Sequence, residues 1–254
     1  MYMNNSILAK NLLVHKQIEE ICDECEKQNI KLVLLKGAAL VELFPEYSFY
    51  RDMEDIDVMV CKKDYDKFIN LLKSLGYKNM PSEPSTMFSE NKPLKIDIFT
   101  DLWYLSKKEN VVLFKKLQKV RKFYVLPPKE MLRHIVYHMY IEHNFVDERW
   151  LKDIELIKSK FHLETDYESL FPFWIRSWIN KKIFYKGHIL EFLVLPINKK
   201  IQFLIKKFFP SPKFVEKRYN LKTSFLLPFV YFYRFFSLIV HTINVFYKLV
   251  FAEK

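Results

Sequence analysis

Glycine is scarce in this chain, at 3 residues among 254, and cysteine is equally scarce at 3. Half of the residues are hydrophobic and 28% are charged, so the composition excludes a disordered, collagen-like or low-complexity protein. The length excludes a small disulfide-stapled scaffold and suits one large domain or two modest ones. Residues 1–13 lack the basic start and the sustained apolar run of a signal peptide, so we expect a reducing, cytoplasmic location.

Acidic residues are few in the last third of the sequence. Residues 181–254 hold 14 Lys or Arg and only 3 Asp or Glu, a net charge of +11, which equals the net charge of the whole chain. Residues 1–100 carry −3 and residues 101–180 carry +3. This asymmetry indicates a basic surface that faces an anionic partner such as lipid, nucleic acid or another phosphate-rich surface.

The spacing of hydrophobic residues changes near residues 124–128. Before that point strand patterns alternate with helical ones, and after it every pattern is helical and interrupted by prolines. We therefore predict an α+β fold, with a catalytic domain at residues 1–125 and an α-helical domain at residues 126–254. In the first half we expect helices at 7–27, 38–44, 62–75 and 111–121, strands at 31–35, 55–60 and 95–99, and a loop or flap at 79–93.

Three aspartates fall on the predicted strands. Asp55 and Asp57 are two residues apart, so their side chains leave the same face of one strand, and Asp97 lies between two isoleucines on another. Adjacent carboxylates repel each other unless a cation joins them, and hard oxygen ligands suit Mg²⁺. The pattern predicts a two-ion Mg²⁺ site for phosphoryl transfer. The alternative is an Asp-x-Asp pair at the edge of a strand without a metal.

Lys36, Gly37 and Arg51 are candidates for contact with phosphate. Gly37 lies at a strand-to-helix turn, where the backbone N–H groups of a helix N-terminus can approach a phosphate. Lys36 and Arg51 would supply positive charge for a triphosphate. The alternatives are that Gly37 serves a plain tight turn and that the two cations are solvated.

These motifs resemble those of the uncharacterised nucleotidyltransferase family, within the polymerase-β-like nucleotidyltransferase superfamily. The resemblance rests on LLKGAAL at residues 34–40, RDMEDIDVMV at 51–60 and IDI at 96–98, and it covers roughly residues 31–103. A weaker match, WLKDI at 150–154, resembles the helical module of the family. Two positions depart from the usual pattern, because Ala38 stands where Ser is common and Phe99 where His often follows the third Asp.

The resemblance implies a nucleotidyltransferase-type mixed sheet and the transfer of a nucleoside monophosphate from an NTP, with ATP as the expected donor, to an acceptor hydroxyl. Asp55 and Asp57 would bind the ion that holds the triphosphate, and Asp97 with a second Mg²⁺ would lower the pKa of the acceptor. Asp101 is a rival third ligand, and we prefer Asp97 because of its apolar flanks. The nucleotide-binding residues would be Lys36, Gly37, Ala38 and Arg51.

Residues 225–252 have the pattern of one long apolar helix. The longest run without a charged residue in this helix, Phe235–Tyr247, is 13 residues, or about 20 Å against a hydrocarbon core of roughly 30 Å, which disfavours a simple transmembrane span. We predict that residues 206–252 lie on an anionic membrane, peripheral to its inner surface, and packing into the helical domain or a dimer interface is an equal alternative. The basic residues that would face lipid are Lys206, Lys207, Lys213, Lys217, Arg218 and Lys222.

A nucleic-acid partner is less favoured than a membrane. The aromatic residues of this segment gather on an apolar helix, whereas single-stranded nucleic acid is bound where aromatics alternate with basic residues on a sheet. A second hypothesis, of a different class, is a non-catalytic binding module that keeps the fold, such as a toxin antidote or a membrane-surface assembly factor.

Overall fold

The computed structural model describes residues 5–80, 83–181, 183, 186–221 and 223–251 of the chain. Within the predicted membrane segment, Lys222 and residue 252 lie outside the described residues, as do residues 81–82 of the predicted loop. The chain folds into two compact units. Unit 1 consists of Met1–Leu102, Lys107–Val136 and Asp147–Glu164, and unit 2 of Trp103–Ser106, Tyr137–Val146 and Thr165–Lys254.

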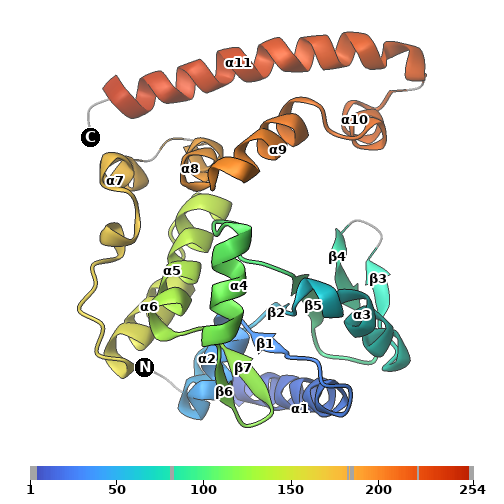
Figure 1. Cartoon of the computed structure of the whole chain (residues 1–254), viewed down its shortest axis with the longest axis vertical. Coiled ribbons are helices and arrows are strands. Elements are labelled where there is room, and N and C mark those ends of the chain that lie inside the picture. The colour runs from blue at the N-terminus through green and yellow to red at the C-terminus, as the bar shows by residue number, and fades with distance from the viewer. Residues whose placement is uncertain (1–4, 81–82, 182, 184–185, 222, 252–254) are drawn as a thin grey trace. The chain divides into compact units, whose positions relative to one another are not determined.

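A mixed β-sheet forms the centre of unit 1 (Figure 1). Its described strands, seven in number, are ordered β3-β4-β5-β2-β1-β7-β6. β1 pairs with β7 and β2 with β5 in parallel, and the other neighbours are antiparallel. The strands are β1 (Val33–Leu34), β2 (Asp55–Met59), β3 (Lys78–Met80), β4 (Glu83–Phe88), β5 (Lys95–Phe99), β6 (Gln118–Val120) and β7 (Phe123–Val125).

Helices flank this sheet, and the α+β class predicted from the sequence is confirmed. The central strand β1 is fully buried, as its run of aliphatic residues predicts. The first helix and the strand of Asp97 have nearly the predicted bounds. The helices that begin in unit 1 are α1 (Asn5–Lys27), α2 (Lys36–Leu43), α3 (Tyr65–Ser74), α4 (Lys107–Lys116), α5 (Pro128–Tyr137) and α6 (Glu148–Lys160), with 3₁₀ turns at Pro45–Phe49 and Lys62–Asp64.

Two predicted elements of unit 1 are wrong. The predicted loop at 79–93 contains most of the β3–β4 hairpin, because Thr86 and Met87 are buried against β5, which outweighs the loop signal of the neighbouring prolines. The predicted helix at 111–121 ends at Lys116, and β6 and β7 follow as a hairpin.

The boundaries of the compact units differ from the predicted domain boundary at residues 125 and 126. Residues 147–164, predicted to lie in the helical domain, belong to unit 1. A buried ion pair joins this segment to the first 100 residues, since Asp153 of α6 accepts hydrogen bonds from Tyr47 and Arg51.

Unit 2 is helical. Its long C-terminal helix α11 packs along α8, α9 and α10, which lie beside it in Figure 1. The helices are α7 (Arg176–Ile179), α8 (Lys186–Val194), α9 (Ile197–Phe208), α10 (Pro212–Tyr219) and α11 (Leu227–Phe251), with a π-helix at His138–His143 and 3₁₀ turns at Tyr167–Leu170, Phe173–Ile175 and Ser224–Leu226.

Candidate active site

The three predicted aspartates lie on adjacent strands of unit 1. Asp57 of β2 is the direct register partner of Asp97 of β5, and Asp55 precedes Asp57 by two residues. In a parallel pair with this register, all three side chains leave the same face of the sheet. The opposite face is apolar, because Ile56, Ile96 and their neighbours at alternate positions are buried. The sheet therefore brings the three carboxylates together.

Negative charge is concentrated at this place. Burial, and after it the carboxylates of Asp57 and Asp97, raise the pKa of Asp55 to about 6. Two cations oppose this effect, Lys36 and Lys95. The site therefore stabilises added positive charge.

Lys36 is the closest cation to the aspartates. Its Nζ donates a hydrogen bond to Asp57 Oδ1 at 2.9 Å, and both side chains are 9% exposed. The same Nζ lies 5.4 Å from the centroid of the Phe99 ring, a cation–π distance. Phe99, which departs from the pattern of the family, thus contacts the site through Lys36.

The backbone of Lys36 is strained. Its φ of 45° lies in the left-handed region, which a non-glycine residue adopts at a cost of about 1 kcal/mol or more. The residue begins α2, whose first intrahelical hydrogen bond runs from Ala39 N to Leu35 O at 3.2 Å. Leu35 N in turn donates to Asp57 O at 3.0 Å, so the positive end of the α2 dipole lies beside the aspartates. Gly37 and Ala38 occupy the first turn of this helix.

Asp97 has a partner that the sequence did not reveal. Thr86 Oγ1 on β4 donates to Asp97 Oδ1 at 2.6 Å, and Lys95 Nζ lies 3.9 Å from Asp97 Oδ2. The Asp97 side chain remains 23% exposed. In the sequence, the β-branched Thr86 beside Met87 and Phe88 indicates a strand, but the prolines at 81, 84 and 93 favour a loop.

Gly37 and Arg51 are packed against each other. A Cβ added to Gly37 would lie 3.2 Å from an Arg51 terminal nitrogen, so the missing side chain makes room for the guanidinium. Arg51 Nε donates to Asp153 at 2.9 and 3.1 Å, and Tyr47 Oη donates to Asp153 Oδ1 at 2.9 Å. Asp153 is fully buried; burial raises its pKa, and Arg51 opposes that shift.

This network bears on the predicted role of Arg51. Asp153, from the WLKDI segment, forms a buried ion pair with it. The Arg51 side chain is 9% exposed and forms an ion pair with Asp153, a contact that no local sequence pattern indicates. Its contact with a phosphate stays a prediction.

The donor set suits a hard divalent cation, because it consists of carboxylates on one face, and burial together with the charges of Asp57 and Asp97 raises the pKa of Asp55. Within the described residues, no three Asp, Glu, His or Cys side chains are grouped closely enough to hold a metal ion as they stand. The ammonium group of Lys36 contacts Asp57 Oδ1, one of the oxygens that a cation would bind.

Asp101, the rival third ligand, lies two residues past the end of β5 that pairs with Met59, and so at the end of the strand pair away from Asp55. It lines a separate cavity of about 450 Å³ in unit 1, together with Lys62, Lys63, Lys107 and other residues. Asp97, the register partner of Asp57, is therefore the better placed of the two rivals.

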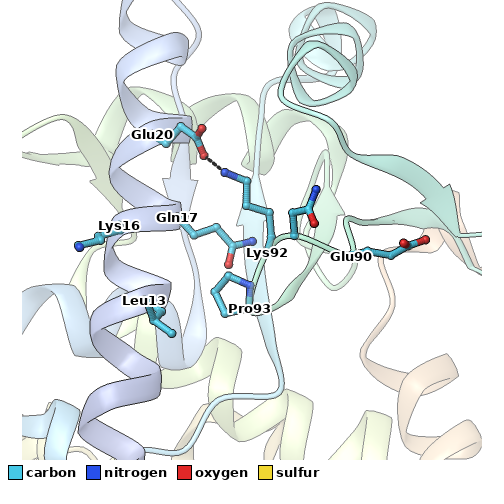
Figure 2. A pocket seen from close by; sticks show the side chains of 8 residues that line it. Leu13, Lys16, Gln17, Glu20, Glu90, Lys92 and Pro93 are labelled. Carbon is cyan, nitrogen blue, oxygen red and sulfur yellow. Dashed lines mark hydrogen bonds and ion pairs between the residues drawn. The ribbon is translucent and has the colours of Figure 1, made fainter.

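Another cavity of unit 1, about 660 Å³, contains none of the predicted site residues. It lies between α1 and the loop before β5, and Figure 2 shows Glu20 and Lys92 paired across it. Gln17 at its floor is satisfied, since its Nε2 donates to Tyr77 Oη at 2.9 Å and to Leu94 O at 2.7 Å.

The sequence profile of the uncharacterised nucleotidyltransferase family matches residues 3–190, which is more than half of the chain. The chain belongs to the uncharacterised nucleotidyltransferase family. It is a nucleotidyltransferase enzyme, as the aspartate motifs predicted. The match spans β1 to β7 together with all three aspartates.

Two solved structures are similar to this nucleotidyltransferase. The antibiotic-resistance factor ANT(2'')-Ia in solution is 12% identical, with a TM-score of 0.43, over 63% of this chain and 86% of that one. The crystal structure of ANT(2'')-Ia in complex with adenylyl-2''-tobramycin is also 12% identical, with a TM-score of 0.45, over 65% of this chain and 95% of that one. No curated protein gives a significant match.

Proposed function

We propose that this nucleotidyltransferase moves a nucleoside monophosphate from a nucleoside triphosphate, with ATP as the expected donor, to an acceptor hydroxyl and releases pyrophosphate. The register of Asp57 with Asp97, which gathers three carboxylates beside a helix N-terminus, carries the proposal. Asp55, Asp57 and Asp97 would hold Mg²⁺, which when bound neutralises the phosphates and lowers the pKa of the attacking hydroxyl.

The residues of the chain itself have separable roles in this proposal. The N–H groups of the first turn of α2, at Gly37 and Ala38, would bind phosphate oxygens, as at other helix N-termini. Lys36 would leave Asp57 and pair with the triphosphate when a divalent cation takes its place on that carboxylate. Asp97, with Thr86 fixing one of its oxygens, would accept the proton of the acceptor hydroxyl.

In this scheme Arg51 supports the first turn of α2 and does not bind Mg²⁺. Because Asp153 holds it against Gly37, its guanidinium adds positive charge behind the first turn of α2. The pair would keep the turn in the shape that phosphate binding needs.

Two isotopic labels test the reaction class. Cell lysate is incubated with the protein, Mg²⁺ and ATP labelled at either the α- or the γ-phosphate. We expect the α-label to enter an acceptor, with the mass gain of a nucleotide, and the γ-label to appear in pyrophosphate. Entry of the γ-label into the acceptor would show a kinase reaction instead and would refute the proposal.

Lys36→Met should separate cation binding from nucleotide binding. Without the ammonium group Asp57 is left as a buried carboxylate, so we expect Mn²⁺ alone to stabilise the variant against heat more than it stabilises the wild type. The KM for ATP should rise about tenfold, because the triphosphate loses a charged donor. Methionine, like lysine, has a side chain that is strained at the positive φ of residue 36, so the backbone strain is the same in both proteins. The difference between the variant and the wild type therefore reports the loss of the charge.

Lys31→Met is the matched control, since Lys31 is exposed and lies over the Tyr124 ring away from the aspartates. It should leave both quantities unchanged. Equal stabilisation of Lys36→Met and the wild type by Mn²⁺ would contradict the idea that Lys36 occupies the cation position.

A further inference from the structure

One face of α11 is apolar and uncovered. Large hydrophobic side chains recur at intervals of three and four residues along it, and each is at least 50% exposed in unit 2. They are Phe229, Phe232, Phe236, Val240, Ile243 and Tyr247. The hollow along this face, about 570 Å³, is lined by residues of α11 alone. A continuous apolar stripe of this length marks an interaction site.

The opposite face of α11 is fixed to its own unit. Near the start of the helix, Arg234 donates to Lys207 O at 3.0 Å and Tyr231 Oη donates to Pro210 O at 2.6 Å. Near its end, Val245 is buried and Lys181 Nζ donates to Leu249 O at 2.8 Å. The exposed stripe is therefore the face of α11 that does not pack against the rest of unit 2.

We infer that this stripe inserts into the surface of an anionic membrane, with α11 lying in the plane of the bilayer. The residues beside the stripe favour a membrane as the partner, because they are polar or basic and exposed along one side of it. They are Ser237, His241, Asn244 and Lys248. Such side chains can reach the headgroup layer while the aromatic rings enter the acyl boundary. The inference does not depend on the proposed function.

Charge also favours lipid over a second copy of the chain. Residues 181–254 carry 14 basic and 3 acidic residues, a net charge of +11. Two copies joined through α11 would bring these charges together, whereas an anionic membrane attracts them. Lys206 of α9, and Lys213 and Lys217 of α10, are exposed on helices that pack against α11.

A span across the bilayer is less consistent with the packing. Among the described residues, Ser224–Phe251 is the one helical segment long and apolar enough to cross, and none of its most apolar 18-residue window is buried. Both ends of α11 are nevertheless bound to the same basic unit, through Arg234 and Lys181. A crossing helix would have to break these contacts or carry charged groups into hydrocarbon, which is costly.

Flotation of the full-length protein with lipid vesicles tests the inference. We expect the wild type to float with vesicles of phosphatidylcholine mixed with phosphatidylglycerol, far less with phosphatidylcholine alone, and to be released by high salt. The combined variant Phe229→Gln, Phe236→Gln and Ile243→Gln should lose at least roughly tenfold in bound fraction, because Gln keeps the helix but removes apolar area.

The matched control is Val111→Gln with Val112→Gln, which removes exposed apolar side chains from α4 in unit 1. It should float like the wild type, and circular dichroism should show that both variants remain folded. Three results would overturn the inference: equal flotation of the α11 variant and the wild type, retention of the wild type in the vesicles through alkaline carbonate, and a lipid-free dimer that the α11 variant converts to monomer.

Discussion

Asp57→Asn should lower nucleotidyl transfer about a thousandfold while leaving the protein folded. The side chain keeps its shape and can still accept a hydrogen bond from Lys36, but the charge that would hold Mg²⁺ is lost. Asp57 is nearly buried and is paired across strands with Asp97, so no other carboxylate can take its position. Transfer of α-phosphate label, at saturating ATP, measures the loss.

Asp101→Asn is the control for that prediction. It changes the same chemical group two residues beyond the end of β5, in a different cavity, and should retain transfer within about twofold. The thermal midpoint of Asp57→Asn without added metal should be close to that of the wild type, because the charge of Asp55 still opposes that of Lys36 and the repulsion between Asp57 and Asp55 is removed. If Asp57→Asn transferred the label as fast as the wild type, the aspartates would have no role in the reaction.

Asp153→Ala should destabilise the protein by about 3 to 5 kcal/mol, because it leaves the Arg51 guanidinium buried without its carboxylate. It also removes the acceptor of the Tyr47 hydroxyl. For a chain of this size the thermal midpoint should fall by roughly 6 to 20 °C. Transfer at low temperature should fall as well, since Arg51 is no longer held against Gly37.

A surface ion pair supplies the comparison for Asp153. Lys160 of the same helix pairs with Glu46 at 2.7 Å, but both side chains are exposed, so Lys160→Ala should cost less than about 1 kcal/mol. Replacing both buried partners, as Arg51→Met with Asp153→Leu, should restore much of the stability without restoring transfer. If Asp153→Ala melted within a degree of the wild type, the buried pair would have no structural role.

The carboxylate strands could be predicted because their signals are local. Asp55 and Asp57 alternate with apolar residues, and Asp97 is flanked by two isoleucines, so the pattern of each strand indicates which of its faces is polar. The pairing of β2 with β5 did not follow from those patterns alone. The structure supplies this pairing, because β2 and β5 are parallel neighbours with Asp57 and Asp97 in register.

Other parts of the site depend on contacts between distant segments. Arg51 and Asp153 are 102 residues apart, and no pattern in either segment indicates the other. Thr86 lies in a stretch rich in proline and small polar residues, where the local preference opposed the strand that burial against β5 imposes. Tertiary packing overrode local propensity in both cases.

In the C-terminal helix too, the local features could be predicted from the sequence and the contacts with distant segments could not. Its length and its stripe of polar residues could be read from the sequence, because helical periodicity is local. Which apolar face is covered could not be read, since that depends on Lys181 and Lys207 of other segments, which bind the two ends of α11.

Diffraction from crystals grown with Mn²⁺ and a non-hydrolysable ATP analogue tests the central claim most directly, because the anomalous signal of Mn²⁺ locates the cation independently of activity. We predict a cation bound by the oxygens of Asp55 and Asp57, with the triphosphate at the first turn of α2 and Lys36 turned away from Asp57. A nucleotide bound in the lysine-lined cavity around Asp101, with no cation at the three aspartates, would contradict the account.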